Sequence, residues 1–179
     1  MNRNLKALIA LSLILAAAPL ATAQQEPQNP AQMRIQKEVR HEILMLPYFG
    51  VFDNIAFQVQ GGTVTLLGQV VRPDVKSDAG NAVKHIEGVD QVINNIEVLP
   101  PSPLDDGLRM RLFRAIYGFP SLEKYALGVQ KPIRIIVNSG HVTLEGVVDS
   151  ASDKDTAGIR ANSVSGIFSV TNNLQVVPN

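Results

Sequence analysis

The chain has 179 residues, no cysteine, and equal numbers of basic and acidic side chains, with 16 Lys and Arg against 16 Asp and Glu. Without cysteine there are no disulfides, no thiolate metal sites and no lipid-modified N-terminal cysteine. A balanced charge also argues against a nucleic-acid-binding protein, which usually carries a clear basic excess. Each domain must therefore be held together by its hydrophobic core alone.

The N-terminal segment has the composition of a secretory signal peptide. Arg3 and Lys6 precede an uncharged apolar run at 7–18, and Ala21-Thr22-Ala23 is a small-x-small cleavage site. The run is shorter than the ~20 residues of a membrane span, so we expect cleavage after Ala23 and a periplasmic protein that is not a lipoprotein. Residues 24–30 are polar and contain proline, which predicts a disordered leader.

The rest of the chain contains one pattern twice, at a spacing of 78 residues. GTVTLLGQV begins at Gly62 and GHVTLEGVV at Gly140, and the match continues without a gap to Val98 and Val176. A repeat of this length is the size of a small domain and too long for a solenoid unit. We therefore predict domains at 31–99 and 104–178, joined by a stiff Pro-rich linker at 100–103.

Each repeat opens with a predicted helix. An apolar residue recurs every fourth position, at Ile35, Val39 and Ile43 and again at Leu108, Leu112 and Ile116. Asp105 and Asp106 stand at the N-terminal end of the second of these helices, where the helix dipole favours acids. The first helices match at a spacing of 73, so the second repeat has five extra residues, and these fall within 121–132.

After the first helix, each repeat predicts a β-hairpin, a second helix and a last strand. Apolar residues alternate with others at 55–59 and 64–70, and again at 133–137 and 142–148. The second helices begin near Pro73 and Ser150. Because crossovers are right-handed, the last strand runs parallel to the second hairpin strand. The predicted fold is α+β, with two tandem α-β-β-α-β domains, each a mixed three-stranded sheet with two helices on one face.

Six glycines occupy matched positions that favour a structural role. They are, in pairs, Gly62 and Gly140, Gly68 and Gly146, and Gly88 and Gly166. The first pair lies in the hairpin turns, the second on the inward face of a strand at a bulge or the close approach of a helix, and the third suits left-handed helix C-caps. Gly80 and Gly158 lie inside the second helices, where each costs ~1 kcal/mol relative to alanine; close packing would explain that cost.

The pattern GxVTLxGxV, followed by a helix, a glycine and then V-x-N-x-[IL]-x-V, resembles the BON domain. The pattern is complete from Gly62 to Val98 and from Gly140 to Val176. Its two asparagines, Asn94 and Asn172, occupy apolar positions and are predicted to be buried and hydrogen-bonded. The resemblance implies a non-enzymatic periplasmic module of the soluble, osmotically inducible type, associated with envelope integrity and phospholipid binding.

No motif in the sequence predicts catalysis or metal binding. His41, His85 and His141 belong to different elements, without metal-ligand spacing, and are interpreted as surface residues. Ser121 and Lys124 satisfy S-x-x-K, but no accompanying motif supports a nucleophile. We therefore expect no catalytic residue, no metal and no cofactor.

One region of the second repeat combines arginines with aromatic and apolar side chains. The candidate residues are Arg109, Arg111, Arg114, Tyr117, Phe119, Leu122 and Tyr125. Positive charge interleaved with aromatic residues on a helix is typical of an interfacial lipid-binding face. In the alternative interpretation, the aromatic residues pack in the core or between the repeats and the arginines are solvated.

Two hypotheses of function follow. In the first, the second domain binds anionic phospholipid or membrane surfaces. In the second, the protein is a protein-interaction or chaperone-like module that holds envelope proteins through exposed sheet edges and the 121–132 insertion. A hydrolase is the least supported class, and no nucleic-acid partner is expected.

Overall fold

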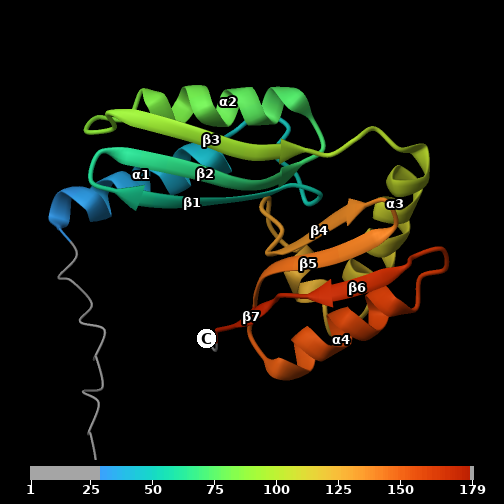
Figure 1. Ribbon diagram of the computed structural model, residues 1–179. Helices are drawn as coiled ribbons and strands as arrows, with labels where there is room; N and C mark the ends of the chain where they lie inside the picture. The colour runs from blue at the N-terminus through green and yellow to red at the C-terminus, as the bar shows by residue number, and fades with distance from the viewer. Residues whose placement is uncertain (1–28, 178–179) are drawn as a thin grey trace, which may run out of the picture.

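The computed structural model describes residues 29–177, so the predicted signal peptide and residues 24–28 of the predicted leader lie outside the described residues. The first domain contains α1 (Pro30–Leu44), β1 (Asn54–Gln60), β2 (Thr63–Val70), α2 (Pro73–Lys84) and β3 (Gln91–Val98). The second contains α3 (Pro103–Tyr117), a 3-10 turn η1 (Glu123–Ala126), β4 (Ile133–Asn138), β5 (His141–Val148), α4 (Ala151–Asn162), β6 (Ser169–Asn172) and β7 (Gln175–Val176). Figure 1 shows the two domains one after the other along the chain.

The predicted α+β fold class is confirmed. In the first sheet β1 pairs antiparallel with β2 and β2 pairs parallel with β3, and in the second β4, β5 and β6 repeat this arrangement. The predicted last strand of the second domain is interrupted between Asn172 and Gln175, so that β6 and β7 pair separately with β5. The first helix begins at Pro30, where Asn29 accepts a hydrogen bond from the Ala31 backbone N–H.

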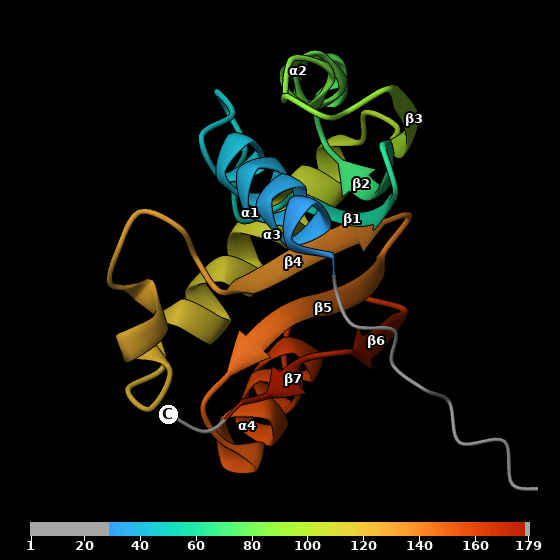
Figure 2. The same cartoon turned by 90° about the vertical axis from the view of Figure 1, so that its left-hand side faces the viewer.

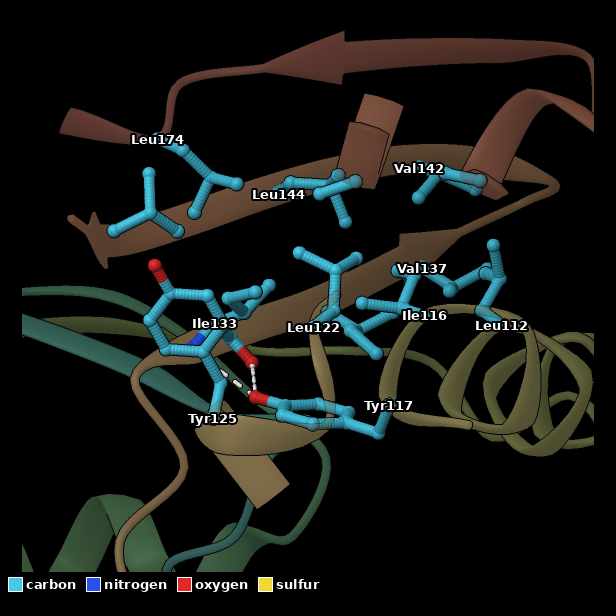
Figure 3. Packing of buried hydrophobic residues seen from close by; sticks show 14 of the residues in the cluster. Leu112, Ile116, Tyr117, Leu122, Tyr125, Ile133, Val137, Val142, Leu144 and Leu174 are labelled. Carbon is cyan, nitrogen blue, oxygen red and sulfur yellow. Dashed lines mark hydrogen bonds between the residues drawn. The ribbon is translucent and has the colours of Figure 1, made fainter. Parts of the chain in front are cut away.

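Each domain has its own hydrophobic core between the sheet and its two helices. In the first, the predicted stripe of α1 packs with Val75, Ala79 and Val83 of α2 and the inward residues of the strands. In the second, the stripe of α3 packs with Ala157 and Ala161 of α4, and Figure 3 shows part of this cluster. Because each sheet has its helices on one face, the alternation read from the sequence defines which side is buried.

The loop between α1 and β1 connects the two cores. Its residues Val51 and Phe52 pack against the core of the second domain, and the Phe52 ring meets Phe113 of α3 edge-on, with centroids 6.4 Å apart. The backbone N–H of Ile135 in β4 donates to the Val51 carbonyl at 2.9 Å. The first domain thus supplies part of the second domain's packing and one backbone-to-backbone hydrogen bond to its sheet edge.

Two side chains hold this loop in shape. Asp53 is buried and accepts hydrogen bonds from the backbone N–H groups of Gly50 and Val71, both at 2.8 Å. Arg134 of β4 donates to the Gly50 carbonyl at 2.8 Å, and its guanidinium lies 4.5 Å from the centre of the Phe49 ring. Burial raises the pKa of the Asp53 carboxyl, an effect that its two backbone hydrogen bonds and the Arg134 charge partly offset.

The glycines inside the second helices make room for the asparagines that recur in the last strands of both repeats. A Cβ atom at Gly80 would lie 2.8 Å from Nδ2 of Asn94, and one at Gly158 would lie 2.9 Å from Nδ2 of Asn172. Each asparagine donates from Nδ2 to a helix carbonyl at 2.8 Å, that of Lys76 or Lys154. Both asparagines are hydrogen-bonded as predicted, but they are half-buried and not fully buried. The repeated cost of glycine has a packing reason.

The six matched glycines occupy three kinds of position, and two of these differ in detail from the expectation. Gly68 and Gly146 have φ of +115° and +116°. Each faces a backbone carbonyl at the start of the neighbouring strand, that of Asn54 or Pro132, and not a helix. Gly88 and Gly166 have the expected positive φ, +88° and +90°. They are not the C-caps, however, because the helices end earlier and the caps are His85 and Ser163. Gly62 and Gly140 lie in the hairpin turns as predicted.

We predict that Gly158→Ala destabilises the protein by about 1–2 kcal/mol, although alanine is the better helix former. The added methyl group displaces the Asn172 amide from its bond with the Lys154 carbonyl. In an Asn172→Ala background the same substitution is expected to be stabilising. Urea unfolding of the single and double variants measures this difference.

Gly107→Ala is the matched control, because a Cβ there would meet only the mobile end of Arg111. It is expected to stabilise α3 by up to about 1 kcal/mol. Equal effects of Gly158→Ala with and without Asn172 would contradict the packing explanation.

Candidate functional site

The helix α3 carries three of the residues that the sequence proposed for a lipid face. Pro103 occupies its first turn, and Ser102 Oγ accepts from the Asp105 backbone N–H. Asp105 itself is buried and accepts from the backbone N–H groups of Ser139 and Gly140, both at 2.9 Å. These bonds tie the start of α3 to the β4–β5 turn and thereby set which side of the helix faces solvent.

Arg109 lies on the buried side of α3. Its side chain is 3% exposed, pairs with Asp106, and donates from Nη2 to the Val137 carbonyl of β4 at 2.7 Å. Its Nε is buried without a hydrogen-bond partner in the structure. The guanidinium therefore joins the helix to the edge of the sheet and is not available to a membrane surface.

Tyr117, at the end of α3, is also part of the core. Its hydroxyl donates to the Ile133 carbonyl at 2.6 Å and accepts from the Ile133 N–H at 3.1 Å, the two dashed contacts in Figure 3. Burial raises the pKa of this phenol above its usual value, so the hydroxyl keeps the proton that it donates even in alkaline solution. The Tyr117 hydroxyl thus fixes the first residue of β4 to the end of α3.

Leu122 and Tyr125, from the predicted insertion, lie under the same domain. Leu122 is fully buried, and Tyr125 is 6% exposed, with its hydroxyl donating to Asp153 and accepting from the Asp149 N–H, both at 2.8 Å. With Arg109 and Tyr117, four of the seven candidate residues are core residues. Of the lipid-binding face predicted from the sequence, burial therefore leaves only Arg111, Arg114 and Phe119.

The remaining residues form the solvent side of α3, which we call the α3 basic face. It consists of Met110, Arg111 and Arg114 of α3, together with Phe119 and Arg160. Arg111 and Arg114 are exposed, and Met110 is 45% exposed between Arg109 and Arg111 in the sequence. Arg160, from α4, lies 4.9 Å above the half-buried Phe119 ring and donates to the Ala115 carbonyl at 3.2 Å. The structure thus adds a third, half-buried arginine to this face, which sequence spacing could not connect to α3.

The first domain has no equivalent of this face. At the spacing of 73 that aligns the two helices, Arg111 corresponds to Glu38 and Arg114 to His41. Glu38 and His41 are both exposed on the surface of α1. Basic residues at these two helix positions are therefore a property of the second domain alone.

The insertion presents a second exposed feature at its tip. Leu127 is 75% and Val129 is 94% exposed, on either side of Gly128, which has φ +93°. The Lys131 ammonium donates to the carbonyls of Ala126 and Gly128 and so closes the loop, while Gln130 donates to the Leu44 carbonyl of the first domain. Two apolar side chains are held out from the surface by these polar contacts.

The other residues weighed in the sequence have surface or structural positions. The three histidines are exposed. The Lys124 ammonium pairs with Asp149 at 2.9 Å and with Asp153 at 3.0 Å, which gives it a structural role beside Ser121. Within residues 29–177, no group of three or more histidine or acidic side chains could hold a metal ion, and no helix there is long and apolar enough to cross a membrane.

Comparison with known proteins finds one family. The sequence model of the BON domain matches residues 33–100 and 122–178. The first match includes nearly all of α1, whereas the second begins after α3 and so leaves out Arg111, Arg114 and Phe119. No curated protein matches the chain.

Among solved structures, the chain is similar to CdsD, a structural protein of the type III secretion system of Chlamydia trachomatis. One structure of it is 15% identical, with 82% of this chain and 93% of that chain covered, and a structure of its C-terminal domain is 16% identical, with 82% and 99% covered. The TM-score is 0.30 in both cases. A likeness of this size supports no argument about function.

We predict that Lys124→Met destabilises the protein at neutral pH and that this effect disappears in acid. Burial raises the pKa of the Asp153 carboxyl, but hydrogen bonds from Lys124, Tyr125 and Ser150 outweigh it and hold the pKa below its usual value. A lowered acid pKa stabilises the fold above the unfolded value of ~4 and ceases to do so as the pH falls through the folded value. Urea unfolding of both proteins between pH 7 and pH 2 checks this, and a difference independent of pH would contradict it.

Proposed function

The chain belongs to the BON-domain family, and we propose that it is a periplasmic, non-enzymatic envelope-maintenance module that binds anionic phospholipid surfaces through its second domain. BON domains are binding modules associated with phospholipid and the cell envelope, and the family match covers both halves of this chain. We further propose that binding serves the envelope under osmotic stress.

The observation that carries this proposal is the α3 basic face. Arg111 and Arg114 are exposed on one helix beside Met110, with Arg160 above the Phe119 ring. Basic side chains at an anionic membrane surface contribute ~1 kcal/mol each, and apolar neighbours add burial at the headgroup boundary. Three arginines therefore favour reversible binding that weakens as salt is added.

A protein-interaction or chaperone-like function is the second candidate, and the tip of the insertion favours it. Leu127 and Val129 are exposed in the loop in which the second repeat has five extra residues. Two apolar side chains held away from the surface are suited to contact an apolar site on another protein. Deleting the tip removes such a contact and leaves the α3 basic face in place.

Flotation with lipid vesicles tests the lipid proposal. We expect the protein to float with vesicles containing anionic phospholipid at low salt and to remain at the bottom with zwitterionic ones. Arg111→Glu with Arg114→Glu is expected to lower the bound fraction at least about tenfold, because each reversal replaces an attraction by a repulsion. Circular dichroism of the variant checks that it is folded.

The control is Lys37→Glu with Arg40→Glu, which makes the same change of charge on the exposed side of α1. It is expected to float nearly as well as the original protein. Equal loss in both double variants would reduce the effect to net charge, and no flotation with anionic vesicles would reject a lipid-binding function.

A further inference from the structure

The two sheets of this protein end in edge strands of different kinds. β4 and β1 are equivalent strands, each at the edge of its sheet next to the first helix of its domain (Figure 1 and Figure 2). A sheet edge presents a row of backbone N–H and carbonyl groups that need partners. The two domains supply these partners very differently.

On β4, four of the six outward backbone groups of Ile133, Ile135 and Val137 are bonded by the protein itself. The Tyr117 hydroxyl bonds both the N–H and the carbonyl of Ile133, the Val51 carbonyl accepts from Ile135, and Arg109 donates to the carbonyl of Val137. The cover comes from α3 and from the loop of the other domain. The β4 edge is therefore closed to a further strand.

On β1 the equivalent residues are Ile55, Phe57 and Val59. The tight turn pairs Gln60 with Thr63, so the even-numbered residues of β1 bond to β2 and the odd-numbered ones face outward. The Val59 carbonyl accepts from Gln32 of α1 at 2.6 Å. For Ile55 and Phe57, the part of the chain that the structure describes provides no partner for these outward groups.

The β1 edge has free backbone groups because α1 lacks the side chains with which α3 bonds to β4. At the spacing of 73, Tyr117 corresponds to Leu44, which has no polar group, and Arg109 corresponds to Gln36. Phe113, which receives Phe52 in the second domain, corresponds to Arg40. The first domain has therefore kept the groove beside its edge strand but not the groups that fill it.

This groove is open and basic. It has a volume of about 980 Å³ and is lined by one side of α1, including Met33, Lys37 and Arg40, and by residues 55–60 of β1. A smaller hollow continues it past Ile55 towards Arg134. No acidic residue lines either part, and within residues 29–177 neither Lys37 nor Arg40 takes part in an ion pair.

We propose that the α1–β1 groove binds an extended acidic segment of a partner protein, which adds to β1 as a further strand. The free backbone groups of Ile55 and Phe57 provide hydrogen bonds that do not depend on the partner's sequence. Lys37 and Arg40 select for carboxylates, while the half-buried Phe57 ring and the Met33 side chain accept an apolar residue between them. The occupied β4 edge is the internal precedent, since a loop backbone of this chain already bonds to it at Ile135.

A synthetic peptide tests the proposal on the purified protein. The probe is a fluorescent peptide of about eight residues in which glutamate alternates with valine and threonine, long enough to span β1. We expect saturable binding by fluorescence anisotropy. In NMR spectra, hydrogen exchange at the Ile55 and Phe57 amides is expected to slow when the peptide is added, because these N–H groups acquire acceptors.

Three changes separate strand addition from general charge attraction. Lysine in place of glutamate in the peptide, and N-methylation of alternate peptide residues at unchanged charge, are each expected to weaken binding at least about tenfold. Lys37→Glu with Arg40→Glu in the protein is expected to do the same. Arg111→Glu with Arg114→Glu, the vesicle-binding variant, is expected to bind the peptide as the original protein does.

Several results would overturn this assignment. Equal binding of the N-methylated peptide, or unchanged exchange at Ile55 and Phe57, would show that no strand is added. Loss of vesicle flotation in the Lys37→Glu, Arg40→Glu variant alone would make the groove a lipid site. A failure of vesicle binding leaves this prediction intact, because the two tests use different variants and different faces of the molecule.

Discussion

The arrangement of the second domain depends on how the outward backbone groups of β4 find hydrogen-bond partners. A buried strand edge cannot leave its N–H and carbonyl groups unpaired without a cost of ~1–3 kcal/mol for each group. Here Tyr117 and Arg109 of α3 and the Val51 carbonyl of the first domain supply the partners. One set of bonds therefore orients α3, closes the sheet and attaches the first domain.

The same bonds explain why the two domains present different surfaces. Arg109 and Tyr117 are turned towards the sheet, whereas Arg111 and Arg114 are exposed. Arg111 and Arg114 are two and five positions beyond Arg109, and at 3.6 residues per turn neither position falls on the face of Arg109. In α1 the corresponding residues leave the strand edge open and place Glu38 and His41 outside. One domain thus has a closed edge and a basic helix, and the other has an open edge and a basic groove.

Much of the core of each domain could be predicted from the repeated sequence motif. The hairpins, the parallel last strands and the hydrogen-bonded asparagines follow from alternation, from the crossover rule and from the polarity of Asn94 and Asn172. The candidate site was less predictable. Closely spaced arginines and aromatic residues look the same in a sequence whether their side chains are exposed or buried. No sequence pattern therefore distinguished the buried Arg109 from the exposed Arg111. Arg160 is 46 positions from Arg114 in the sequence, and only the packing of α4 on α3 brings it to Phe119.

The sequence by itself determined the two repeated α-β-β-α-β units and their family, because local periodicity and an internal repeat encode these directly. Only the tertiary structure decided which edge strand is covered and which basic residues reach solvent. Both outcomes depend on contacts between residues far apart in the chain, such as Val51 with Ile135. Hydrogen bonds of that kind are made by backbone groups, which every residue carries, and so they leave no mark in the sequence.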